Sequence, residues 1–279
     1  MPSNYAHYRF GKQLLSSLPA DVRRPIQRFR RLYDMGLHGP DLFFYHNFLT
    51  RDIVGSLGQK YHHQTGREFF TRACKHLHQE PTEAGIAYLY GVLAHFCLDS
   101  VFHPFVLRQT ESGAITHTEL ETEFDRYLLL KDGVQEPHTY DCSAHMTLTR
   151  GECVTLAEFY PPVTADNVLH SLRSMARSVK AMAVPEGARR RFVKKALSVT
   201  KPAIRQLMIP THPVRACAAL DEEMMMLYNE AAELYPQLVQ QLMAHMAYNA
   251  YLGSSFDRTF DGTGEPVRHE WGTMEVKLS

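Results

Sequence analysis

The sequence predicts an all-α fold, built as a single compact multi-helix domain over residues 1–255. Helical spacing of apolar residues dominates the chain, whereas the strict alternation that marks half-buried strands is hard to find. Of the 279 residues, 44% are hydrophobic and 11% are aromatic, which is enough for a substantial core. The helical periodicity is lost over residues 256–279, so we expect an irregular tail on the surface.

Eight segments have the spacing and end signals of helices. Thr116 and Glu119 form a capping box that predicts the start of one helix. Because proline lacks a backbone N–H, we expect a kink at Pro202 and a break at Pro236. Turn-forming residues dominate residues 132–163, which predicts a long loop or lid. The predicted helices cover residues 21–34, 52–63, 66–78, 82–103, 117–131, 164–183, 187–208 and 220–251.

The charges of the chain balance. Thirty basic residues equal thirty acidic ones, so no global field favours nucleic acid or an anionic membrane. Two local basic runs, residues 23–31 and 188–195, are interpreted as solvated helix faces. We therefore expect no stable nucleic-acid partner, and the sequence leaves the oligomeric state open.

Cysteine usage and hydropathy indicate the compartment. The five cysteines are scattered and odd in number, which fits a reducing environment. The N-terminal segment carries Arg9 where a signal peptide needs an apolar run. The longest apolar run, residues 85–98, is shorter than the ~20 residues of a membrane span. These features predict a cytoplasmic protein without a transmembrane segment.

Three polar residues lie at intervals of four inside the most apolar predicted helix. His95, Asp99 and His103 share one helical face, and Gly91 precedes them on it, as expected where another group comes close. Pro104 disfavours the helical conformation at His103 and predicts that this residue ends the helix. Buried carboxylates and imidazoles must be hydrogen-bonded, protonated or bound to metal. A hydrogen-bonded core cluster would explain one pair, but it explains three residues in register less well.

A second pair of the same kind follows. His117 and Glu121 lie four apart at the start of the next predicted helix, and the preceding turn can bring the two faces together. Asp41 comes directly after Gly39-Pro40, where a helix can start. The remaining candidates are His7 and either His62 or His63.

These residues have the chemistry of a zinc site. Nitrogen and oxygen ligands without cysteine suit Zn²⁺, and eight ligands exceed what one tetrahedral ion uses, so we expect two to three ions. Closely spaced zinc ions can bind phosphate and lower the pKa of a bound water to ~7. Asp99 is placed to bridge two ions, because a carboxylate has two oxygens.

The ordered set of candidates resembles the zinc-dependent phospholipase C family of bacteria. That family is all-helical, uses three zinc ions and hydrolyses the phosphodiester of phosphatidylcholine and related lipids. The resemblance implies a first zinc held by Asp41, His62, His95 and Asp99. It implies a second zinc held by His103, His117 and Glu121, and a third held by His7, Asp99 and the N-terminus of the chain. Asp41 would also lie beside the attacking water as a general base.

Three details qualify the resemblance. The choice of His62 over His63 rests on its offset from Leu57-Gly58. Secreted members begin with a tryptophan that completes the third zinc site, whereas this chain begins Met1-Pro2, so the third site has the least support. Toxin members carry a C-terminal β-sandwich that docks on membranes, and we expect no counterpart here.

The sequence therefore predicts a zinc-dependent hydrolase that cleaves phosphodiester bonds in phospholipids or small phosphodiesters. One alternative is a zinc-dependent nuclease or nucleotidase. The zero net charge of the chain and its single tryptophan count against a groove that binds single-stranded nucleic acid. Another is a protein whose zinc ions only hold helices together. That alternative predicts closed coordination, with no open position for water.

Overall fold

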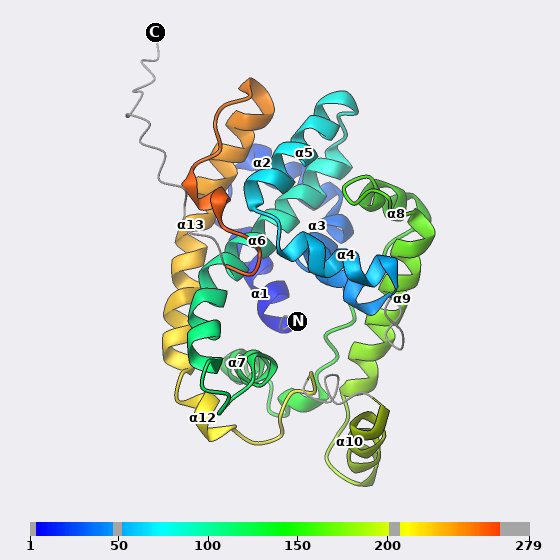
Figure 1. The fold of residues 1–279 in the computed structure, drawn as a ribbon, viewed down its shortest axis with the longest axis vertical. Helices are drawn as coiled ribbons and strands as arrows, with labels where there is room; N and C mark the ends of the chain where they lie inside the picture. Colours follow the sequence, from blue (N-terminus) through cyan, green and yellow to red (C-terminus); the bar gives the residue numbers. More distant parts are fainter. Residues whose placement is uncertain (1–3, 47–51, 201–206, 263–279) are drawn as a thin grey trace.

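The computed structural model describes residues 4–46, 52–200 and 207–262 (Figure 1). The predicted all-α fold is confirmed, because the ordered elements of these ranges are helices and the sole strand-like pairing among them is an isolated bridge between Thr65 and Thr259. The five cysteines are free and buried.

The long helix α6 (Glu83–Thr110) is the centre of the fold. It packs most extensively against α3 (Arg30–Gly36) and α13 (Asp221–Tyr248). By length and composition α6 could cross a membrane, but 94% of its most apolar window is buried inside the structure. Its hydropathy is therefore explained by its place in the core.

Several predicted helices are confirmed. They are α4 (Ile53–His62), α5 (Gly66–Gln79), α7 (His117–Lys131) and α9 (Ala165–Met182). The capping box that starts α7 is present, with the Thr116 side chain accepting from the Glu119 backbone and the Glu119 side chain accepting from the Thr116 backbone. The predicted helix over residues 187–208 begins as α10 (Ala188–Thr200), and Pro202 lies outside the described residues.

Other helix boundaries differ from the prediction. The segment expected as one helix over residues 21–34 is divided at Phe29, whose ψ of 46° leaves the helical range, into α2 (Ala20–Arg28) and α3. Helix α13 continues through Pro236 without the expected break. Outside residues 132–163, two of the described α-helices were not predicted, namely α1 (Asn4–Leu14) and α12 (Arg215–Ala218).

The predicted lid over residues 132–163 is wrong. This segment contains a short 3-10 helix (Pro137–Thr139) and the helix α8 (Arg150–Ala157). Leu156 and Tyr160 are fully buried, so the segment packs into the core. Its turn-forming residues separate short helices and do not form one long loop.

The predicted surface tail is wrong for residues 256–262. Phe256 and Phe260 are fully buried, and the 3-10 helix η3 (Ser254–Asp257) packs against α5. In Figure 1 this orange-red segment follows α13 and returns to the middle of the molecule. The expected domain boundary at residue 255 therefore falls inside packed structure, and residues 263–279 lie outside the described ranges.

The close approach inferred at Gly91 is confirmed. Helices α3 and α6 cross at Gly36 and Gly91, and a Cβ atom on Gly91 would lie only 2.3 Å from the Tyr33 carbonyl oxygen. Because this neighbour is backbone, a side chain at Gly91 would force the two helices apart.

We expect Gly91→Ala to lower the free energy of unfolding by roughly 1–3 kcal/mol, the usual cost of overpacking, as measured by urea denaturation. The control is Gly151→Ala in α8, where the nearest atom to an added Cβ is 4.0 Å away. At that position alanine should be neutral or stabilising by up to ~1 kcal/mol, because it favours the helix more than glycine does. Equal losses in both variants would contradict the close-approach explanation.

Candidate metal centre

The structure brings all eight predicted ligand residues together. They come from α1, the 3-10 helix η1 (Gly39–Tyr45), the end of α4, α6 and the start of α7. They form three groups, and within each group one ligand atom per residue lies within 4.8 Å of the others. The groups are Asp41, His62 and His95; His7, His95 and Asp99; and His103, His117 and Glu121.

The first group is built around Asp41. Its Oδ1 lies 2.8 Å from His62 Nε2, and its Oδ2 lies 3.8 Å from His95 Nε2. Gly39 adopts a positive φ of 47° at the start of η1, and a Cβ there would lie 2.7 Å from His95 Cδ2. The glycine thus lets η1 begin directly against His95. The structure places His62 in this group, whereas the His63 side chain is 63% exposed and pairs with Asp261.

Asp99 links the groups. His7 Nε2 lies 3.1 Å from its Oδ1, and His95 Nε2 lies 3.2 Å from its Oδ2. His103 Nε2 lies 3.9 Å from Oδ1, so three imidazoles face one buried carboxylate. The spacing of four along α6 produces this arrangement, since it places His95 and His103 one turn before and after Asp99. The position of Asp99 suits a bridging ligand.

The group of His103, His117 and Glu121 lies where α6 meets α7. His117 Nε2 is 2.9 Å from Glu121 Oε1, and His103 Nε2 is 3.6 Å from the same oxygen. The expectation that His103 ends its helix is wrong, because α6 continues through Pro104 to Thr110. His103 is therefore held inside a continuous helix.

Three of the histidines are oriented by main-chain carbonyls. Nδ1 lies 2.7 Å from the Gly58 oxygen in His62, 3.2 Å from the Leu37 oxygen in His95 and 2.9 Å from the Phe260 oxygen in His103. A carbonyl only accepts, so Nδ1 carries the hydrogen and, in a neutral ring, the Nε2 lone pair faces the carboxylates. Such a contact is unfavourable unless a proton or a metal ion lies between the two acceptors.

Several buried polar atoms of the centre have no hydrogen-bond partner among the described residues. Leaving such atoms unsatisfied is costly, so buried polar atoms of this kind are suited to binding a ligand. A cation shared between carboxylates and imidazoles would satisfy them, and the donor set suits zinc. The unpartnered atoms are Asp41 Oδ1 and Oδ2, His7 Nδ1, His95 Nε2, Asp99 Oδ2 and Glu121 Oε2.

The electrostatics of the protein groups in the candidate centre also favour positive charge there. Burial disfavours the charged forms, yet His95, His103 and His7 hold the pKa of Asp99 well below its usual range. Burial lowers the pKa of His95 to about 4 despite the nearby Asp99 and Asp41. At His103 the carboxylates of Asp99 and Glu121 outweigh burial and raise the pKa to about 9. The carboxylates thus stay charged, and cations are drawn to them.

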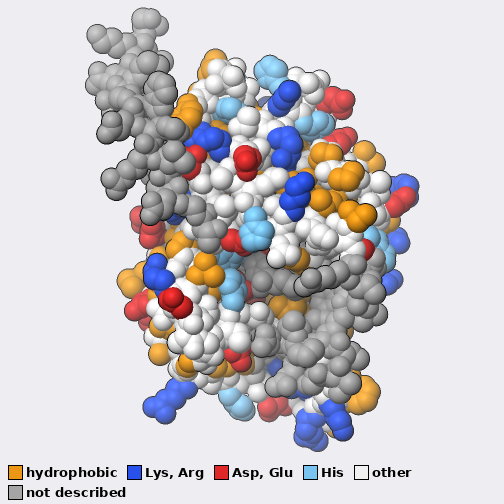
Figure 2. All heavy atoms as spheres, in the orientation of Figure 1, with side chains coloured by type: hydrophobic (Ala, Val, Ile, Leu, Met, Phe, Trp, Pro, Cys, Tyr) orange, Lys and Arg blue, Asp and Glu red, His pale blue; other side chains and the backbone are white. Residues whose placement is uncertain are grey.

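The candidate centre opens on one side to a cleft of about 360 Å³. Histidine side chains reach the surface near the middle of the face shown in Figure 2. Three of the candidate ligands, His62, His103 and His117, line this cleft and therefore border space that a substrate or water can enter. The cleft is lined by Phe44, Gln59, His62, His63, His103, His117 and Asp261.

The sequence prediction missed the outer partners of the centre. The carbonyls of Leu37, Gly58 and Phe260 belong to the main chain, which every residue carries, so no residue type marks them. Asp261 at the cleft also escaped notice. The spacing of four between Phe256 and Phe260 was the available signal that this segment packs against the core.

The sequence matches the model of a known protein family. The sequence model of the family described as zinc dependent phospholipase C matches residues 6–158. All eight candidate ligands lie inside the matched region. No curated protein and no solved structure matches the chain.

Proposed function

The chain belongs to the zinc-dependent phospholipase C family, and from this premise we propose that it hydrolyses the phosphodiester bond of phospholipids or smaller phosphodiesters with two to three zinc ions. The observation that carries the proposal is the joining of three ligand groups through Asp99 and His95 beside an open cleft. A phosphodiester in this cleft would lie against the exposed side of the ligand groups.

We propose that the three ligand groups hold two to three zinc ions, because His95 belongs to two of the groups and its Nε2 can bind only one ion. Bound zinc would neutralise phosphate charge and make a water molecule acidic enough to lose a proton near neutral pH. The protein would hold these charges in a buried setting, where electrostatic stabilisation of a transition state is strong. The buried carboxylates of Asp41, Asp99 and Glu121 offset the positive charge.

Asp41 is the residue we propose as the general base. Its Oδ1 faces His62 Nε2 at 2.8 Å and its Oδ2 lies 3.8 Å from His95 Nε2, so one oxygen can contact a metal ion while the other accepts a proton. In the reaction the water oxygen forms a bond to phosphorus, and Asp41 accepts the proton of that water. The bond from phosphorus to the leaving oxygen breaks, and the leaving oxygen takes up a proton that balances the one accepted by Asp41. The products are an alcohol and a phosphomonoester.

Two other functions have less support. A purely structural set of zinc ions predicts closed coordination, whereas His62, His103 and His117 line the cleft. A nuclease would present aromatic platforms for stacked bases, and Phe44 is the one Phe, Tyr or Trp side chain that lines the described cleft. Both readings remain outcomes of the following experiment.

We expect the purified protein to hydrolyse p-nitrophenyl phosphorylcholine. Activity should disappear on chelation and return when zinc is added, because the same site supplies charge neutralisation and the nucleophile. Phospholipid vesicles, single-stranded DNA and a nucleoside 3′-phosphate are assayed in parallel. Preference for either nucleic-acid substrate would favour the nuclease reading, and full zinc occupancy without turnover of any of them would favour structural zinc.

A further inference from the structure

We infer that residues 258–262, here called the C-terminal strap, form an outer part of the metal centre, in which the Phe260 carbonyl is a positioning group for His103. The inference rests on the proposed metal centre and adds to it a segment outside the matched region 6–158. According to this inference, residues 258–262 are necessary for metal binding by His103, His117 and Glu121.

The strap meets α6 where that helix lacks a hydrogen bond. Pro104 has no N–H to give to the Ser100 carbonyl, four residues earlier in the helix. The Arg258 Nη1 donates to this carbonyl at 3.2 Å. The first residue of the strap thus replaces the bond that proline removes, and it lets α6 continue past His103.

The next contact acts on the ligand itself. His103 donates its Nδ1–H to the Phe260 carbonyl at 2.9 Å, which fixes the tautomer and the ring orientation. With the ring held in this way, Nε2 faces the carboxylates of Asp99 and Glu121, at 3.9 and 3.6 Å. Without this acceptor, rotation of the imidazole would turn Nε2 away from the group.

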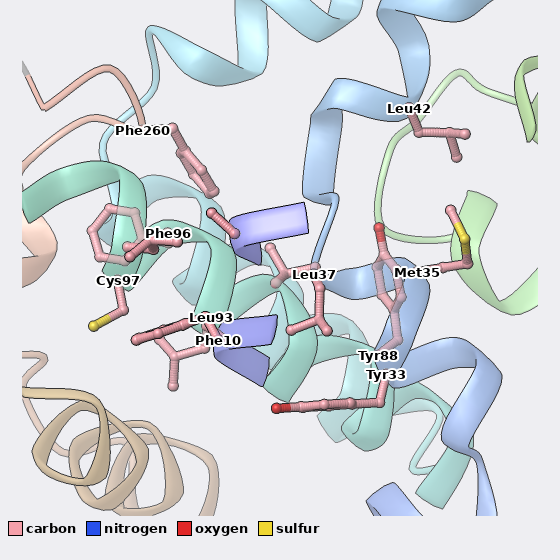
Figure 3. Packing of buried hydrophobic residues seen from close by; sticks show 14 of the residues in the cluster. Phe10, Tyr33, Met35, Leu37, Leu42, Tyr88, Leu93, Phe96, Cys97 and Phe260 are labelled. Carbon is pink, nitrogen blue, oxygen red and sulfur yellow. The ribbon is translucent and has the colours of Figure 1, made fainter. Parts of the chain in front are cut away.

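The carbonyl of Phe260 is held in place by the core. The Phe260 ring is fully buried, with its centroid 5.1 Å from that of Phe96 (Figure 3). Its centroid lies 5.6 Å from that of Phe69. On the other side the Asp261 N–H donates to the His62 carbonyl at 3.3 Å. The strap is therefore fixed against two elements that carry candidate ligands, α4 and α6.

The strap ends in a contact that only glycine allows. Gly262 has a positive φ of 67°, and a Cβ there would lie 2.5 Å from Pro104 Cδ and 3.1 Å from His103 Cβ. Any larger residue would be strained by its backbone and would also push against His103. This position offers a substitution that displaces the strap from the ligand.

The decisive test compares zinc binding by Gly262→Ala and Phe256→Leu. Phe256 is fully buried just before the strap, with its ring centroid 5.4 Å from that of Phe70 and 5.9 Å from that of Phe96. Neither of these partners is a candidate ligand. Both variants should lower the melting temperature of the metal-free protein. Only Gly262→Ala should weaken zinc binding at one site, by ~10–100-fold, the usual effect of losing an outer partner of a ligand.

Zinc affinity is measured by competition with a chromophoric chelator, and cobalt substitution reports the ligand geometry through its visible absorption. Arg258→Met is a milder second variant, and it should weaken the same site less than Gly262→Ala. Unchanged zinc affinity in Gly262→Ala and Arg258→Met would overturn the inference and leave the proposed function standing. An equal loss in Phe256→Leu would overturn it too, because zinc binding would then follow general stability. A wild-type chain that binds no zinc would overturn the metal centre and the strap together.

Discussion

Asp99→Ala should lose more than one zinc ion per chain. Asp99 belongs to the group of His7 and His95, and its Oδ1 also faces His103 of the third group at 3.9 Å. Removal of the carboxylate deletes a ligand from at least two positions and leaves buried imidazoles without a charge partner. Elemental analysis after gel filtration measures the loss, and hydrolysis should fall below detection with the metal.

The same variant should respond differently to chelation. Metal bound only to the folded state stabilises it, by ~4 kcal/mol when the free ion is at 1,000 times its Kd. The melting temperature of the wild type should therefore drop on chelation, whereas that of Asp99→Ala should change little. The control is Asp34→Ala, which removes a buried carboxylate that pairs with Arg30 and lies outside the ligand groups. Wild-type zinc content in Asp99→Ala would make Asp99 an ordinary buried acid.

The part of the site that could be predicted from sequence is the part fixed by helix geometry. A spacing of four residues places His95, Asp99 and His103 on one face whatever surrounds them, and the same holds for His117 and Glu121. The structure adds how these faces meet. The three groups arise because α1, η1, α4 and α7 meet beside α6. Packing between distant elements has no short sequence signal.

Predictions based on neighbouring residues were wrong where a contact with a distant residue determines the structure. Pro104 favours a helix end, but Arg258 donates to the Ser100 carbonyl and allows α6 to continue. The loss of periodicity after residue 255 suggested a tail, although Phe256 and Phe260 are fully buried. In both cases the deciding contact joins residues more than a hundred positions apart.

Asp41→Asn should separate proton transfer from metal binding. The amide has nearly the size of the carboxylate and keeps one oxygen as a ligand, but it cannot accept the proton of the attacking water. We therefore expect zinc content to be largely retained and turnover to fall by ~10²-fold or more, the usual scale for loss of a general base. The measurement combines elemental analysis with kcat for p-nitrophenyl phosphorylcholine.

The outcome of Asp41→Asn also depends on the geometry of its neighbours. Asp41 Oδ1 lies 2.8 Å from His62 Nε2, so the amide can keep its oxygen toward the metal that His62 would share. The matched control is Asp34→Asn, which should keep wild-type turnover because that carboxylate is engaged with Arg30. If Asp41→Asn loses zinc in proportion to activity, Asp41 acts as a ligand alone and the base must be another group. If it keeps both zinc and turnover, Asp41 is not the general base, and another group accepts the proton of the water.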